Sequence, residues 1–80
     1  MNELDIFLKK FVKQLNDDNP NLITAEMEFR NLESWDSLAS VMVEDMIKSN
    51  YNVTLEEDDI LSVNSISELF SLVIKKQNRE

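Results

Sequence analysis

The sequence contains no cysteine, no histidine and no glycine, and each absence removes a class of function. Without cysteine there is no disulfide framework and no thiolate site, so the compartment need not be oxidising. Without histidine and cysteine, neither an ordinary zinc site nor a serine or cysteine mechanism with a histidine base can be built. Without glycine, no glycine-rich loop can cradle a nucleotide phosphate. We therefore expect no metal site and no catalytic activity of the chain's own.

Basic residues are also scarce. Sixteen Asp and Glu oppose eight Lys and Arg, and the net charge of −8 argues against binding to nucleic acid phosphates. Residues 14–74 hold 13 acidic and two basic residues, and a field of that sign speeds encounters with basic protein surfaces. No apolar run approaches the ~20 residues of a membrane span, and the first residues are acidic, unlike a secretory signal. We expect a cytoplasmic monomer that binds neither membrane nor nucleic acid.

The 80 residues predict one all-α domain over 1–80, a small bundle of three main helices and one short helix. Apolar residues at helical spacing predict the first helix, and the turn formers that end at Pro20 mark where this helix stops. The predicted helices cover about 3–15, 37–50, 56–61 and 66–77. Between the first two we expect a long loop over 16–36, with room for one helical turn.

Three polar residues are predicted to cap these helices. Asp36 precedes the second helix, Thr54 the short acidic one, and Ser65 begins a Ser-x-x-Glu capping box at the last. Tyr51 is expected in an extended connection after the second helix. The apolar faces of the helices define the predicted core, whose most buried members are Phe7, Phe11, Val43, Ile47, Leu69, Phe70 and Val73.

The tetrapeptide Trp35-Asp36-Ser37-Leu38 opens the predicted second helix, after an amphipathic first helix and the long loop. A short acidic helix and a closing helix follow. In this order and at this length the chain resembles an acyl carrier protein, and the resemblance covers essentially the whole sequence. In that family the serine of an Asp-Ser-Leu motif carries 4′-phosphopantetheine. The resemblance therefore implies an acyl-carrier-protein-like bundle with this arm on Ser37 and with Asp36 as part of the motif.

Elementary chemistry is compatible with that role. A serine in the first turn of a helix is exposed, and the unpaired N–H groups there favour a phosphate. Capping preferences alone also predict Asp36 and Ser37 at a helix start, so these residues could serve only as a cap. Fatty-acid carriers usually have Gly-x before Asp-Ser-Leu, whereas here Ser34 and Trp35 precede it. The tryptophan form is similar to carriers of dedicated biosynthetic pathways.

The resemblance implies two kinds of partner. A phosphopantetheinyl transferase would load Ser37 from coenzyme A, and enzymes with basic docking surfaces would add and remove acyl or aminoacyl groups as thioesters. On a helical wheel Leu38 and Met42 turn away from the core, and acidic residues lie nearby. They could instead pack under the long loop. The predicted partner-binding residues, here called the docking face, are Leu38, Val41, Met42, Glu44 and Asp45.

Several alternatives stay open from the residues. The chain could be an unmodified acidic helical adaptor, or an acidic decoy that mimics nucleic acid. The acidic run 56–59 lacks the ligand spacing and the turn glycine of a calcium loop, which favours a solvated helix start. Trp35 is predicted to pack and to anchor the loop beside Ser37, although an indole can also serve as a ligand platform.

Overall fold

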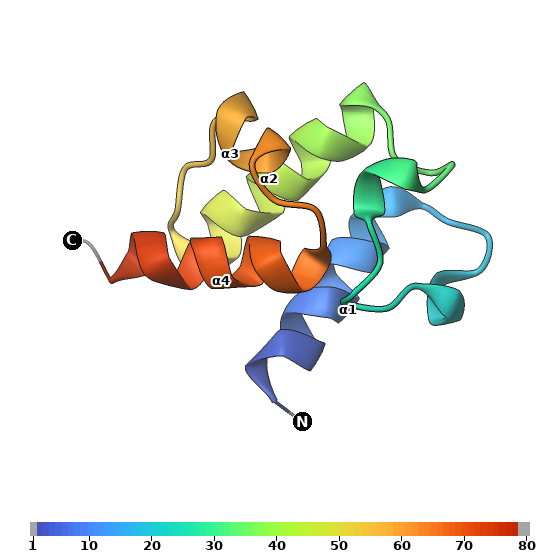
Figure 1. The fold of residues 1–80 in the computed structure, drawn as a ribbon, viewed down its shortest axis with the longest axis horizontal. Coiled ribbons are helices and arrows are strands. Elements are labelled where there is room, and N and C mark those ends of the chain that lie inside the picture. Colours follow the sequence, from blue (N-terminus) through green and yellow to red (C-terminus); the bar gives the residue numbers. More distant parts are fainter. Residues whose placement is uncertain (1, 79–80) are drawn as a thin grey trace.

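A computed structural model describes residues 2–78, and the ends of the predicted domain, 1 and 79–80, lie outside the described residues. Its helices form the all-α bundle predicted from the sequence (Figure 1). Two short 3-10 turns join them. The elements are α1 (Glu3–Leu15), η1 (Pro20–Leu22), η2 (Phe29–Asn31), α2 (Ser37–Tyr51), α3 (Glu57–Leu61) and α4 (Ile66–Gln77). None of the helices within 2–78 combines the length and the apolar character that crossing a membrane requires.

The core lies where α1, α2 and α4 pack against one another. Six of the seven residues predicted to be most buried are fully enclosed, but Phe70 is only half-buried. Its ring contacts the inner Phe7 ring at 5.1 Å between centroids, while its side lines a surface hollow with Ile6 and Ile74. The prediction that Phe70 is among the most buried residues was therefore wrong. Phe29 from the long loop and Ile66 from the apolar face of the last helix were expected to reach the core, and both are fully buried.

The end of α2 lies one residue later than predicted. Tyr51 is its last residue, not part of an extended connection, and Asn52 follows in the left-handed conformation with φ 56°. The Asn52 N–H donates to the Lys48 carbonyl oxygen at 3.0 Å, which closes the helix. Asn16 ends α1 in the same way with φ 54°. Asparagine tolerates this conformation better than other residues with a Cβ atom, so it replaces the missing glycine.

The long loop contains two 3-10 turns where the sequence predicted room for one. It begins with a tight turn in which the Asp17 carboxylate accepts the Asn19 N–H at 2.8 Å, and this bond lowers the pKa of Asp17. Farther on, the loop is tied to the start of α4, since the Ser67 N–H donates to the Ala25 carbonyl oxygen at 2.9 Å. Buried Phe29 fixes the second turn to the core. The loop is thus packed against the bundle through specific contacts with α4 and the core.

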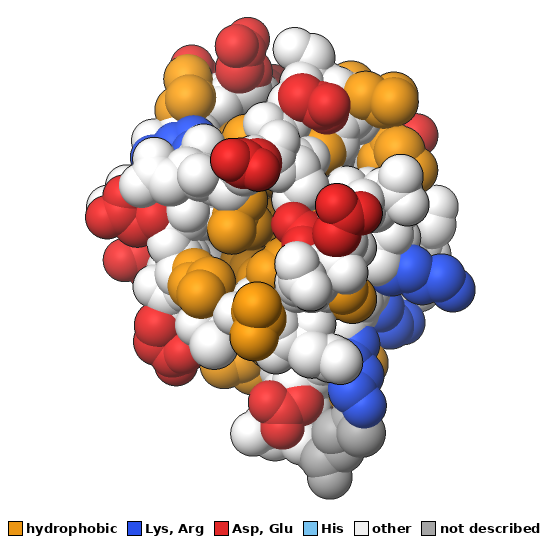
Figure 2. All heavy atoms as spheres, turned by 90° about the vertical axis from the view of Figure 1, so that its right-hand side faces the viewer, with side chains coloured by type: hydrophobic (Ala, Val, Ile, Leu, Met, Phe, Trp, Pro, Cys, Tyr) orange, Lys and Arg blue, Asp and Glu red, His pale blue; other side chains and the backbone are white. Residues whose placement is uncertain are grey.

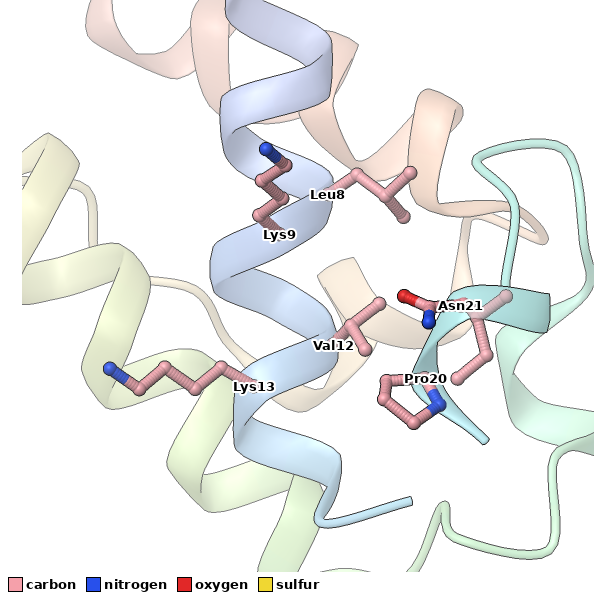
Figure 3. A pocket seen from close by; sticks show the side chains of 7 residues that line it. Leu8, Lys9, Val12, Lys13, Pro20 and Asn21 are labelled. Atoms are coloured by element: carbon pink, nitrogen blue, oxygen red, sulfur yellow. The ribbon is translucent and has the colours of Figure 1, made fainter. Parts of the chain in front are cut away.

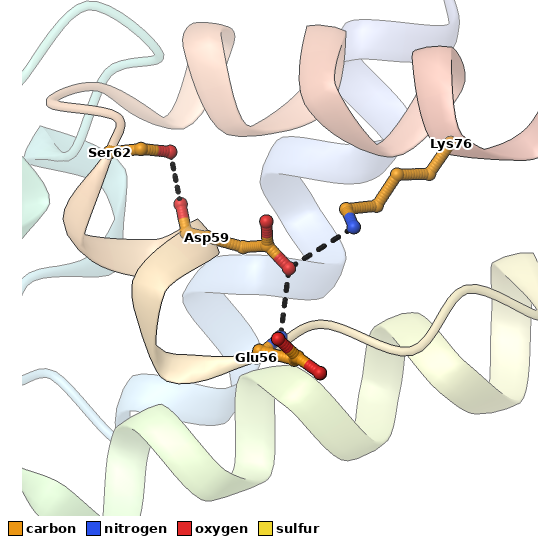
Figure 4. A network of polar contacts seen from close by, with 4 residues as sticks. All are labelled: Glu56, Asp59, Ser62 and Lys76. Carbon is orange, nitrogen blue, oxygen red and sulfur yellow. Dashed lines mark hydrogen bonds and ion pairs between the residues drawn. The ribbon is translucent and has the colours of Figure 1, made fainter.

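The acidic segment before α4 is held by its own carboxylates. Helix α3 begins at Glu57 with Glu56 as N-cap, so the predictions of a helix from residue 56 and of a Thr54 cap were wrong. The Asp59 carboxylate accepts the Glu56 N–H at 2.9 Å and pairs with the Lys76 ammonium at 3.2 Å (Figure 4). The Ser62 hydroxyl donates to the Asp59 carbonyl oxygen at 2.8 Å. The ion pair with Lys76 joins α3 to α4, whereas the other two bonds lie within residues 56–62.

Candidate functional site

The start of α2 presents Ser37 on a fixed backbone. Asp36 has extended geometry, and its Oδ1 accepts the Ala39 N–H at 2.8 Å, so it caps the helix as predicted. Its carbonyl oxygen accepts the Ser40 N–H at 3.0 Å. Ser37 is the first helical residue and its side chain is exposed. The predicted position of Ser37 is confirmed, whereas its role stays a prediction.

Trp35 packs inward beside this turn. Its indole lies parallel to the Phe11 ring at 5.8 Å and edge-on to the Phe29 ring at 4.9 Å. Both phenylalanines are fully buried, and the indole itself is half-buried. The backbone N–H of Trp35 also donates to the Leu32 carbonyl oxygen at 3.0 Å. Trp35 is therefore a packing residue, as predicted, and it ties the end of the long loop to α1.

Two surface hollows flank the Asp36–Ser37 turn. One, of about 570 Å³, lies between α2 and α3 and has Ser37, Val41 and Leu61 in its lining. The other, of about 510 Å³, lies between the end of α1 and α2, and its lining includes Leu38 and Met42. Asp36 contributes to both. A group attached to the Ser37 hydroxyl would therefore have a concave surface beside it on either side.

The predicted docking face is largely open to solvent. Leu38 is 67% exposed, Val41 54% and Met42 39%, so these side chains do not pack under the long loop. Asp45 is exposed, and Glu44 is half-buried with its Oε2 accepting the Ser40 hydroxyl at 3.2 Å. Apolar side chains rimmed by acids on one helix face are suited to a transient interface with a basic partner.

The charge over the molecule is unevenly spread. On the face drawn in Figure 2, most of the basic side chains gather along one edge, while acidic side chains are scattered between apolar ones. Three of the lysines, Lys9, Lys10 and Lys13, belong to α1. Helix α2 contains only Lys48 against Glu44 and Asp45. A basic partner is therefore attracted to the side of the bundle that carries Ser37 more than to α1.

Arg30 holds α3 beside the site, and no pattern in the sequence predicted this. Its guanidinium donates to the Ile60 carbonyl oxygen at 2.8 Å, to the Val63 carbonyl oxygen, and to the Asn64 Oδ1 at 3.0 Å. It also lines the larger hollow with Ser37. Arg30 thus joins the long loop to the C-terminal end of α3, and these bonds hold Leu61 in its position opposite α2.

Replacing Arg30 by methionine is expected to lower the free energy of unfolding by about 1–3 kcal/mol, because buried carbonyl groups lose a charged donor. Amide exchange should accelerate in 57–64 more than in 66–77, as measured by hydrogen exchange with mass spectrometry. Lys48→Met removes an exposed cation from α2 and should change stability by less than about 0.5 kcal/mol. Equal exchange in the two variants would show that α3 is held without Arg30.

A third hollow, of about 380 Å³, lies away from this site between α1 and η1 (Figure 3). Leu8 and Val12 point into it toward Pro20 and Asn21, whereas Lys13 extends to the other side of α1. Neither Ser37 nor any residue of the docking face lines it. It therefore contributes nothing to the chemistry at the start of α2.

The chemistry that the site offers is a single exposed hydroxyl on Ser37, which can accept a transferred group. Sequence reasoning predicted roles for Ser37, Asp36 and the docking face, but it did not single out Arg30 and Leu61, which line the hollow beside Ser37 from the loop and from α3. Over residues 2–78, no three acidic side chains are grouped so that they could hold a metal ion. Compared with protein-family models, curated proteins and solved structures, the chain matched none of them.

Proposed function

We propose that this chain is an acyl carrier protein that holds acyl or aminoacyl groups as thioesters on a 4′-phosphopantetheine arm attached to Ser37. The observation that carries the proposal is the exposure of Ser37 as the first residue of α2, inside a Trp-Asp-Ser-Leu sequence and between two hollows. The exposed apolar and acidic side chains of the docking face add support. A buried or mid-helix Ser37 would have excluded it.

The loading step is a phosphoryl transfer to the Ser37 oxygen. The Ser37 Oγ attacks the phosphorus of coenzyme A that bears the pantetheine, one Oγ–P bond forms, and the pyrophosphate P–O bond breaks. Adenosine 3′,5′-bisphosphate leaves, and the hydroxyl proton passes to a base that the transferase supplies. The chain contributes an accessible oxygen, and the start of α2 stabilises the new phosphodiester through its first-turn N–H groups.

After loading, the chain acts as a tethered carrier. The terminal thiol of the arm holds the cargo, and docking of the bundle on each partner enzyme makes the reaction effectively intramolecular. The hollow between α2 and α3 offers an apolar surface beside the arm, formed in part by Val41 and Leu61. We propose that the cargo belongs to a dedicated biosynthetic pathway, because tryptophan precedes the Asp-Ser-Leu motif.

The proposal is tested by coexpressing the full chain with a broad-specificity phosphopantetheinyl transferase and measuring the intact mass. We expect a gain of one phosphopantetheine in the parent protein and no gain in Ser37→Ala. Ser40→Ala is the matched control, because Ser40 lies one turn further along α2 and bonds to Glu44. It should load like the parent. An unmodified parent protein with several transferases would instead favour the adaptor function.

A further inference from the structure

Trp35 belongs to a cluster of aromatic rings that begins on α1 and ends two residues before Ser37. Its indole contacts Phe11 and Phe29, whose rings lie 5.4 Å apart. Phe11 in turn contacts Phe7 at 6.4 Å. These three phenylalanines have no solvent exposure, so close packing restricts their rings. The indole is consequently packed against fully buried rings of the core.

Only one residue separates this anchored indole from Ser37. That residue, Asp36, is fixed by its two bonds to the first turn of α2, and the Trp35 N–H is fixed by the Leu32 carbonyl oxygen. The backbone from Leu32 to Ser40 is therefore held at both ends. Ser37 is exposed to solvent, while the residue two positions before it is packed against the aromatic cluster.

We propose that Trp35 is a positioning residue for the transfer of phosphopantetheine to Ser37. The inference rests on the proposed function, and it assigns Trp35 a role in the loading rate that packing alone does not require. The transferase must align the Ser37 oxygen with a phosphorus atom, and misplacement of a reacting atom by about 1 Å can cost about 100-fold in rate. Trp35 would act through the backbone of Asp36, without touching coenzyme A.

This role predicts which kinetic constant changes. The docking face projects from α2 itself, so loss of the indole leaves Leu38, Met42 and Asp45 available to the transferase. The KM for the carrier and the KM for coenzyme A should then stay close to the parent values. The kcat of loading should fall, because a loosened Ser37 spends less time in the reactive geometry.

The test is steady-state loading of purified variants by one transferase, with coenzyme A as the donor. Trp35→Met and Trp35→Leu each remove the ring, and methionine adapts to the gap that is left. We expect kcat to fall by at least about tenfold in both. Trp35→Phe keeps a ring against Phe11 and should restore kcat to within about twofold. Circular dichroism establishes that each variant is folded under the assay conditions.

Phe70→Met is the matched control, because Phe70 is a half-buried aromatic residue that packs against Phe7 from α4. It should keep the parent kcat. A kcat equal to that of the parent in Trp35→Met or Trp35→Leu would overturn the inference, and so would an equal loss of kcat in Phe70→Met. A change that is confined to KM, or failure of both Trp35 variants to fold, would also overturn it. If the parent protein itself is not loaded, the proposed function fails instead.

Discussion

The Phe11→Ala variant is expected to lose about 3–5 kcal/mol of stability, the cost of removing a buried phenylalanine ring and leaving a cavity. Phe11 has no solvent exposure and contacts the rings of Phe7, Phe29 and Trp35. The substitution removes contacts to α1, to the loop and to the segment before Ser37 at once. A domain of this size has only a few kcal/mol of net stability, so much of the variant should be unfolded at 25 °C.

Urea denaturation followed by circular dichroism measures this effect, with Trp35 fluorescence as a second probe of the same transition. Ile6→Ala is the control on the same helix, because Ile6 is 40% exposed. It should cost less than about 1 kcal/mol. A Phe11→Ala protein with the same urea midpoint as the parent would show that Phe11 does not pack α1 into the core.

The double variant Met42→Glu with Asp45→Lys is expected to lower group transfer to and from partner enzymes by about tenfold or more, because interface hot spots are worth about 2 kcal/mol or more. Met42 is 39% exposed and Asp45 is exposed, and both lie on α2, five and eight residues after Ser37. The first change places a charge in the apolar centre of the docking face. The second repels a basic partner. Steady-state transfer assays with the holo protein measure the loss.

The thermal melting point separates a docking defect from a folding defect. Because neither side chain is buried, the double variant should melt within a few degrees of the parent. Ser49→Glu is a suitable control: it adds a charge to an exposed site of α2 about 10 Å farther from Ser37 than Met42, and should leave transfer unchanged. Unchanged transfer with every partner, or a collapsed melt, would show that these residues do not form the docking face.

The helices could be predicted because their signals are local. Apolar side chains recur at helical spacing in α1 and α4, and Asp36 and Ser65 are common capping residues. Helix ends were less well predicted. Asn52 ends α2 only because it adopts a left-handed conformation, and nothing in the sequence separates that asparagine from Asn50, which is helical. The acidic residue Glu56 took the capping place predicted for Thr54.

The position of the long loop could be predicted but its conformation could not, because the contacts that hold the loop come from distant residues. Phe29 lies between two charged residues, so no periodicity marks it as buried, yet the rings of Phe11 and Trp35 enclose it. Arg30 resembles any surface arginine until the backbone carbonyl groups of Ile60 and Val63 are brought beside it. Contacts across 30 or more residues are properties of the packed bundle, not of a sequence window.

In the candidate site, too, the features with local sequence signals could be predicted and those that depend on distant contacts could not. Ser37 and the docking face follow from the motif and from the wheel of a single helix. The hollow beside Ser37 does not, because its far wall is α3, and α3 is positioned by Arg30 and by the ion pair of Asp59 with Lys76. A short helix with five residues has no stable position until such contacts form.

The proposed carrier function depends on one covalent bond, between the Ser37 oxygen and phosphopantetheine, and fragmentation mass spectrometry locates that bond directly. The 80-residue chain is incubated with coenzyme A and a purified transferase and is then digested, and the fragments are sequenced. We expect one phosphopantetheine on the peptide that contains Ser37, assigned to Ser37 and not to Ser34 or Ser40. An unmodified peptide with every transferase tested, or a group on another serine, would contradict it.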